Sequence, residues 1–79
     1  MQKIVIMAME PLKSQIEEKL RFQFDVESVD ASNNGICEIK AKLKRDWITI
    51  CRLSASENLR DILTMFEVNF ELRARNYRS

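Results

Sequence analysis

Residues 36–53, ICEIKAKLKRDWITICRL, decide the fold because their polarity alternates and then reverses phase. In the first half, apolar side chains occupy odd positions and charged ones even positions, which is the period of a strand with one buried face. After Arg45-Asp46 the apolar residues move to even positions. A turn centred on Arg45-Asp46 places Leu43 opposite Ile48 and brings both apolar sets to one face. The stretch therefore predicts a β-hairpin.

The same register predicts the side chains on the other face of the hairpin. They are Glu38, Lys40, Lys42, Lys44, Trp47, Thr49, Cys51 and Leu53. Cys37 falls on the apolar face, so the register separates it from Cys51 and predicts that the two form no disulfide. Two cysteines in a chain without a recognisable secretory leader are typical of reduced thiols.

The segments before the hairpin predict a strand, a helix and a second strand. Residues 3–9 are apolar at both parities, which is typical of a central strand. Residues 11–22 are expected to form a helix that begins at Pro11. Its apolar stripe consists of Leu12, Ile16 and Leu20. Residues 25–31 alternate again and predict the second strand.

Asn34-Gly35 is a strong signal for a tight hairpin turn. It predicts that the strand at 25–31 pairs with the first strand of the hairpin, so that three successive strands form an antiparallel meander. In that arrangement Asp25 and Glu27 lie beside the lysines of the outer face and can pair with them.

The pattern Ser54-x-x-Glu57 predicts a capping box that opens a second helix, which extends to about Tyr77. The resulting order is β-α-β-β-β-α. A right-handed crossover through the first helix places both helices on one face of the sheet. Residues 1–79 are therefore expected to form one domain, a two-layer α/β (α+β) sandwich with a four-stranded mixed sheet.

The second helix carries two apolar stripes. The stripe expected to face the core consists of Leu59, Ile62, Leu63, Phe66, Phe70 and Tyr77. Met65, Val68 and Leu72 lie about 150° away around the helix. They either pack on the first helix or bind outside the monomer, and the wide angle favours an outside partner. Trp47, Leu53 and Val29 of the outer sheet face are the other predicted partner-binding residues, used instead of the helix stripe or together with it.

An alternative surface is basic and consists of Lys40, Lys42, Lys44, Arg45 and Trp47. Basic side chains beside an aromatic ring attract phosphates and stack on bases in single-strand binders. The alternative depends on whether Asp25 and Glu27 neutralise these lysines. The arginines of residues 73–78 are instead expected to stabilise the end of the second helix through its dipole.

The composition argues against an enzyme. The chain has no histidine, one glycine and two cysteines. It therefore lacks the usual neutral-pH base, a glycine-rich phosphate loop and a metal-ligand set. No catalytic residue, metal, cofactor or small-molecule substrate is expected.

The net charge of +1 argues against a strongly basic nucleic-acid or membrane-surface protein. No apolar segment is long enough to span a membrane. The sequence therefore predicts a small cytoplasmic regulatory or adaptor protein that binds a partner protein or forms a homodimer. The alternative is a module that binds RNA or single-stranded nucleic acid.

Overall fold

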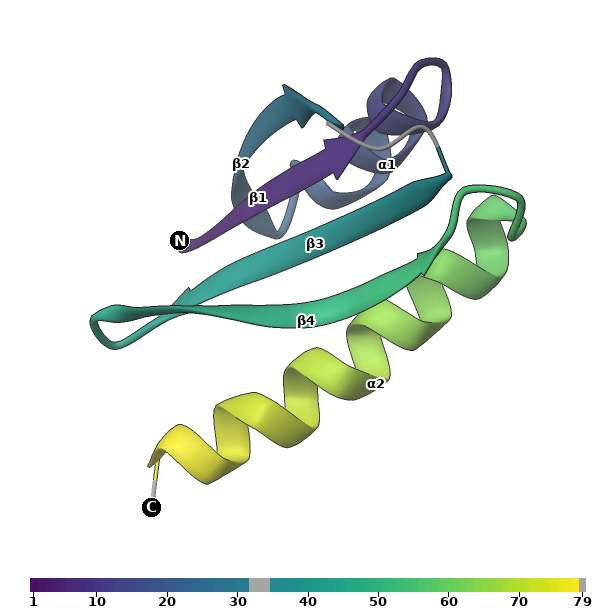
Figure 1. The fold of residues 1–79 in the computed structure, drawn as a ribbon. Coiled ribbons are helices and arrows are strands. Elements are labelled where there is room, and N and C mark those ends of the chain that lie inside the picture. Colours follow the sequence, from purple (N-terminus) through teal and green to yellow (C-terminus); the bar gives the residue numbers. More distant parts are fainter. Residues whose placement is uncertain (32–34, 79) are drawn as a thin grey trace.

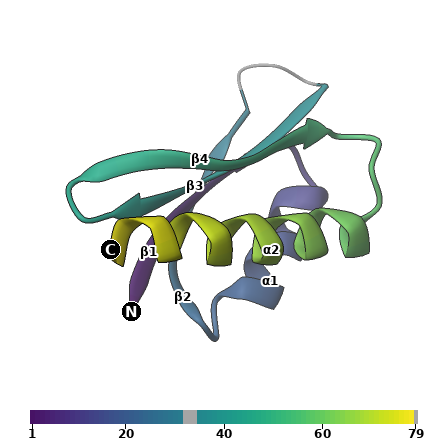
Figure 2. The same ribbon diagram turned by 90° about the horizontal axis from the view of Figure 1, so that it is seen from below.

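The computed structural model describes residues 1–31 and 35–78, and of residue 78 only the backbone. It contains the strands β1 (Gln2–Ala8), β2 (Phe24–Asp30), β3 (Ile36–Leu43) and β4 (Asp46–Ser54), and the helices α1 (Leu12–Leu20) and α2 (Leu59–Arg78). The strands form one sheet, and both helices lie on one side of it (Figures 1 and 2). The predicted two-layer fold with the order β-α-β-β-β-α is confirmed.

The strand order in the sheet is β2-β1-β3-β4, so the predicted meander is wrong. Strand β1 pairs in parallel with β2 and antiparallel with β3, and β3 pairs antiparallel with β4. The central position of β1 agrees with its apolar character. With a neighbour on each side, β1 satisfies its backbone groups along both edges. Asn34, the first residue of the predicted hairpin turn, lies outside the described residues.

The β3–β4 hairpin exists, but its register differs from the predicted one. Asp46 lies opposite Leu43, so the two turn residues are Lys44 and Arg45. Lys44 has a φ of 59°, in the left-handed region that non-glycine residues seldom adopt. The register shifts by one residue between Ile39 and Lys40 of β3, so Ile50 of β4 has no partner opposite it on β3. Such a bulge reverses the alternation of side chains beyond it.

The core lies between the sheet and the helices. Its fully buried large side chains are Ile4, Ile6, Ile16, Ile39, Ile62 and Phe66. Phe66 of α2 meets Phe24 of β2 edge to face at 5.4 Å and stacks with Phe70 at 5.8 Å between ring centroids. The predicted core stripes of both helices are confirmed, because each of their members is buried or packs against this core.

Helix α2 is capped by Asn58 rather than by the predicted Ser54. The Asn58 Oδ1 atom accepts the N–H of Asp61 at 2.8 Å, and the Asn58 amide donates to the Asp61 carboxylate at 3.0 Å. Ser54 is still part of β4, paired with Ile36, and its hydroxyl accepts the N–H of Ser56 at 3.2 Å. The N-cap of α2 therefore lies four residues after the predicted one, and Asp61 binds the Asn58 side-chain amide where a capping box would bind the backbone N–H.

Candidate protein-interaction surface on helix α2

Met65, Val68 and Leu72 form an exposed apolar stripe on α2. Their exposed fractions are 45%, 52% and 53%. The opposite side of the same helix carries the fully buried Ile62 and Phe66. Because half of each stripe side chain faces solvent, packing on α1 does not bury the stripe within the described part of the chain. We refer to these three residues as the α2 stripe.

Two contacts show which flank of α2 bears the stripe. On one flank Phe70 meets Phe24 of β2 edge to face, with 5.1 Å between the ring centroids. On the other, the Asn69 side-chain amide donates to the carbonyl of Ile50 in β4 at 3.1 Å. At about 100° per residue, Asn69 lies between the core face and the α2 stripe. The stripe therefore lies on the flank of α2 directed away from β2 and α1.

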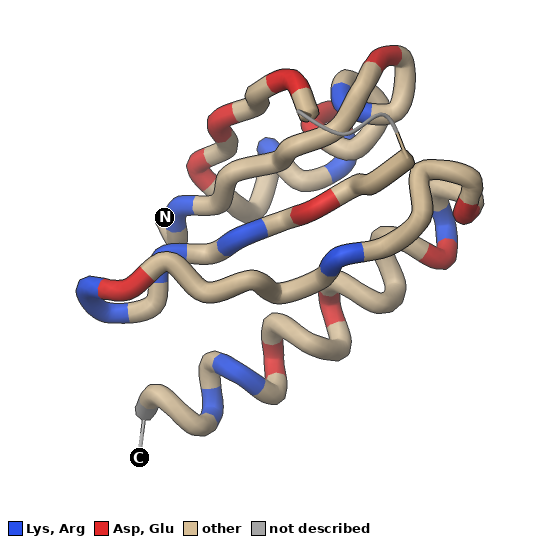
Figure 3. Tube along the Cα trace, in the orientation of Figure 1, with Lys and Arg blue, Asp and Glu red and all other residues tan. Residues whose placement is uncertain are grey.

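The outer face of the sheet, away from the helices, is mixed in charge. Alternation from the buried residues of each strand assigns to it Lys3, Val5, Met7, Asp25, Glu27, Val29, Glu38, Lys40, Lys42, Trp47, Thr49 and Arg52. Figure 3 shows acidic residues along β2 and basic residues around the turn between β3 and β4. A pocket of about 360 Å³ over this face is lined by Lys3, Ile4, Val5, Asp25, Val26, Glu27 and Trp47.

The lysines of the outer face are only partly neutralised, and not by the predicted acids. Because β1 lies between β2 and β3, Asp25 is beside Lys3 rather than beside the β3 lysines. Glu38 instead lies 3.8 Å from Lys40 and 3.6 Å from Arg52. Thus Lys40 has an acidic neighbour from its own strand.

The basic residues nearest the hairpin turn have an acidic residue beside them in the sequence, Asp46, but form no ion pair with it in the described part of the chain. Within residues 1–31 and 35–78, no acidic side chain forms an ion pair with Lys42, Lys44 or Arg45. Trp47, which pairs with Lys42 across the strands, is 47% exposed. The structure therefore brings Lys42, Lys44 and Arg45 together at the hairpin turn beside Trp47, and none of the three forms an ion pair within the described residues.

Leu53 does not lie on the outer face, and that prediction is wrong. The extra residue in β4 turns Leu53 toward the helices, where it is partly buried against the core. The other predicted partner-binding residues on the sheet, Trp47 and Val29, do face outward.

The prediction that Cys37 and Cys51 lie on opposite faces is wrong for the same reason. Cys51 pairs with Ile39, so it shares the inner face with Cys37, and both thiols are buried and free. Burial raises the pKa of the Cys37 thiol. Burial, with a smaller contribution from Cys37, raises the pKa of Cys51 to about 12. Both cysteines are therefore protonated at neutral pH and unsuited to nucleophilic chemistry.

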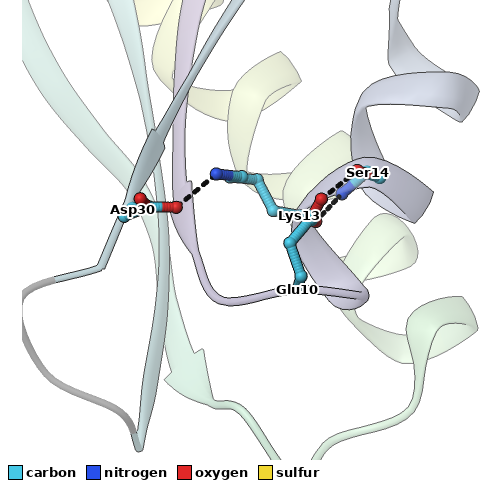
Figure 4. Close-up of polar contacts among 4 residues, drawn as sticks. All are labelled: Glu10, Lys13, Ser14 and Asp30. Atoms are coloured by element: carbon cyan, nitrogen blue, oxygen red, sulfur yellow. Dashed lines mark hydrogen bonds and ion pairs between the residues drawn. The ribbon is translucent and has the colours of Figure 1, made fainter.

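A cluster of four polar side chains at the start of α1 has a structural role (Figure 4). It consists of Glu10, Lys13, Ser14 and Asp30. The Glu10 carboxylate accepts the backbone N–H of Ser14 at 2.9 Å and its hydroxyl at 2.5 Å. These bonds lower the pKa of Glu10. Lys13 forms an ion pair with Asp30 of β2, and its hydrogen bond to that carboxylate raises the pKa of Lys13. The group caps the first turn of α1 and ties the helix to the sheet.

Sequence reasoning did not single out Phe22, which follows α1 and is 74% exposed. The guanidinium of Arg21 lies 5.2 Å from the centre of its ring. The signal was present in the sequence, because Phe22 falls outside the helical spacing of Leu12, Ile16 and Leu20. Arg75, predicted to serve the end of α2, pairs with Glu71 at 2.6 Å.

The described residues contain no group of three or more side chains that could hold a metal ion. Among the same residues, no helix combines the length and apolar character needed to cross a membrane. Comparison of the chain with protein-family models, with curated proteins and with solved structures finds no match in any of the three.

Proposed function

We propose that this chain is a small non-enzymatic binding protein that acts through protein–protein contacts made by the α2 stripe. The observation that carries the proposal is the half-exposure of Met65, Val68 and Leu72 on a helix whose opposite face is buried. Burying the exposed half of each side chain against a partner contributes on the order of 1 kcal/mol to the free energy of binding. A regulatory or adaptor role in the cytoplasm belongs to the same proposal.

Val68→Glu is expected to abolish partner binding and to leave the monomer folded. Val68 is 52% exposed, so a carboxylate at this position remains hydrated in the free chain. In a complex the same carboxylate would be buried without a partner, which costs several kcal/mol. The tagged chain is used to capture proteins from its native cells after nuclease treatment, and far-UV circular dichroism monitors folding.

The matched control is Gln15→Glu, which adds the same charge at an exposed position of α1. The control is expected to retain its captured proteins. Cooperative unfolding of the Val68→Glu chain would place Val68 in the core and contradict the proposal. Capture that is equal for both variants would also contradict it.

A second function, binding of single-stranded nucleic acid, is supported by Lys42, Lys44 and Arg45, which lie beside Trp47 and form no ion pair with any described residue. Lys42→Glu is expected to weaken the affinity for a single-stranded oligonucleotide. Raising the salt concentration is also expected to weaken this affinity. The logarithm of the binding constant should fall with the logarithm of the salt concentration, with a slope of roughly −0.7 per phosphate contact. Trp47, the single tryptophan of the chain, reports binding by quenching of its fluorescence.

The control for this experiment is Lys19→Glu, which reverses a charge at an exposed position of α1 far from the hairpin turn. It is expected to leave the affinity unchanged. Binding that does not respond to salt, or that leaves the tryptophan fluorescence unchanged, would eliminate this second function.

A further inference from the structure

We propose that the partner seated on the α2 stripe is a second copy of this chain, with the two α2 helices packed antiparallel about Val68. This inference rests on the proposed function and adds the identity and the orientation of the partner. The observation that supports it is the position of two charged residues, one at each end of the α2 stripe.

Asp61 and Arg75 extend the α2 stripe at its two ends. Asp61 precedes Val68 by seven residues and Arg75 follows it by seven, and both side chains are exposed. At about 100° per residue, they and the three apolar residues fall within a sector of about 80° of the helix surface. The spacing along this line alternates between four and three residues, which is the spacing of a seam between paired helices.

The charges select the orientation of the pair. A two-fold axis at Val68 between antiparallel helices brings Asp61 of one copy to Arg75 of the other, at both ends of the contact. The same axis brings Met65 of one copy beside Leu72 of the other. A parallel pair would instead place Asp61 against Asp61 and Arg75 against Arg75, which is repulsive at both ends. Figure 3 shows that the C-terminal turns of α2 are basic, and that its acidic residues lie before them.

This symmetry favours a second copy over an unrelated protein. A two-fold interface uses the same patch on both subunits, so the patch must be complementary to itself. An apolar centre with opposite charges at equal distances on either side meets that requirement.

Both flanking residues can take a new partner. Arg75 already pairs with Glu71, but its side chain is 67% exposed, and exposed pairs along a helix are weak. The Asp61 carboxylate accepts one described hydrogen bond, from Asn58, and a carboxylate has room for more.

The free edge of β4 is a less suitable contact between copies. The Ile50 carbonyl already accepts the Asn69 amide, and the bulge at the same place interrupts the regular spacing of edge groups. Bulges and covering helices are devices that prevent pairing at a sheet edge. The contact is therefore assigned to the helices.

Sedimentation equilibrium over a range of concentrations tests the inference with charge-reversed chains. Asp61→Lys makes both ends of the stripe positive, and Arg75→Glu makes both ends negative. For each variant alone, the dissociation constant of the dimer is expected to be higher than that of the unchanged chain by a factor of about ten or more. An equimolar mixture of the two is expected to form a heterodimer, because every end then meets its opposite. A chain carrying both substitutions is expected to regain the homodimer.

Thermal unfolding by circular dichroism confirms that each variant is folded. A chain that stays monomeric at millimolar concentration would overturn the inference, and the proposed function would then still be decided by the capture experiment with Val68→Glu. A dimer that is insensitive to both reversals, or single variants that associate as well alone as when mixed, would overturn the antiparallel arrangement.

Discussion

Phe66→Ala is expected to unfold most of the molecules at room temperature. Phe66 is fully buried and connects Phe24 of β2 with Phe70 of α2, so it joins the two layers of the fold. Removing a buried phenylalanine ring costs about 3–5 kcal/mol. A chain of 79 residues has a core that supplies roughly the same amount in total.

Urea titration followed by far-UV circular dichroism measures this loss. The matched control is Phe22→Ala, which removes the same ring from a position that is 74% exposed. The control is expected to change the free energy of unfolding by less than about 1 kcal/mol. If both variants unfolded at the urea concentration of the unchanged chain, Phe66 would not be the connection between the layers.

Raising the pH from 9 to 12 is expected to lower the free energy of unfolding by roughly 3 kcal/mol through Cys51 alone. Burial raises the pKa of this thiol from 9.0 to about 12 in the folded chain. Between these values the unfolded chain has lost the proton and the folded chain still holds it. The contribution is therefore complete below pH 9 and is lost as the pH rises toward 12.

Urea titrations at several pH values, with reducing agent present, measure this effect against a Cys51→Ala chain. The unchanged chain is expected to lose about 1.4 kcal/mol per pH unit more than the variant across this window. Cys37, whose pKa burial also raises, is present in both chains, so the difference between the two pH slopes reports Cys51. Equal pH slopes would show that the Cys51 thiol ionises as readily in the folded chain as in the unfolded one.

The sequence by itself determined the elements, their order and the buried side of each helix. These properties follow from the spacing of apolar residues, which recur at every second position in a strand and at every third or fourth position in a helix. This spacing is local information. The same repeat separated Met65, Val68 and Leu72 from the core face of α2, and their exposure agrees with that separation. A helix of regular pitch converts residue spacing directly into direction, so this part of the candidate site was predictable.

The strand order required the tertiary structure. Asn34-Gly35 favours a hairpin on local grounds, but β2 lies beside β1 rather than β3. Strand β1 is apolar on both faces, and its central place depends on contacts between residues distant in the sequence. The prediction that Asp25 and Glu27 lie beside the β3 lysines was wrong for this reason.

The tertiary structure also decided the details of β4. One extra residue, Ile50, moves Cys51 and Leu53 from the predicted outer face to the core. The apolar residues of β4 do change from even to odd positions after Ile50, but the same pattern also fits an outward Cys51 and Leu53. The pairing of β4 with β3, beside the bond from Asn69 to the Ile50 carbonyl, decides between the two. Side-chain direction in a strand reverses with every residue, so a single insertion redirects everything after it. A helix shifts by only about 100° per residue, which is why the α2 stripe was predictable and the outer face of β4 was not.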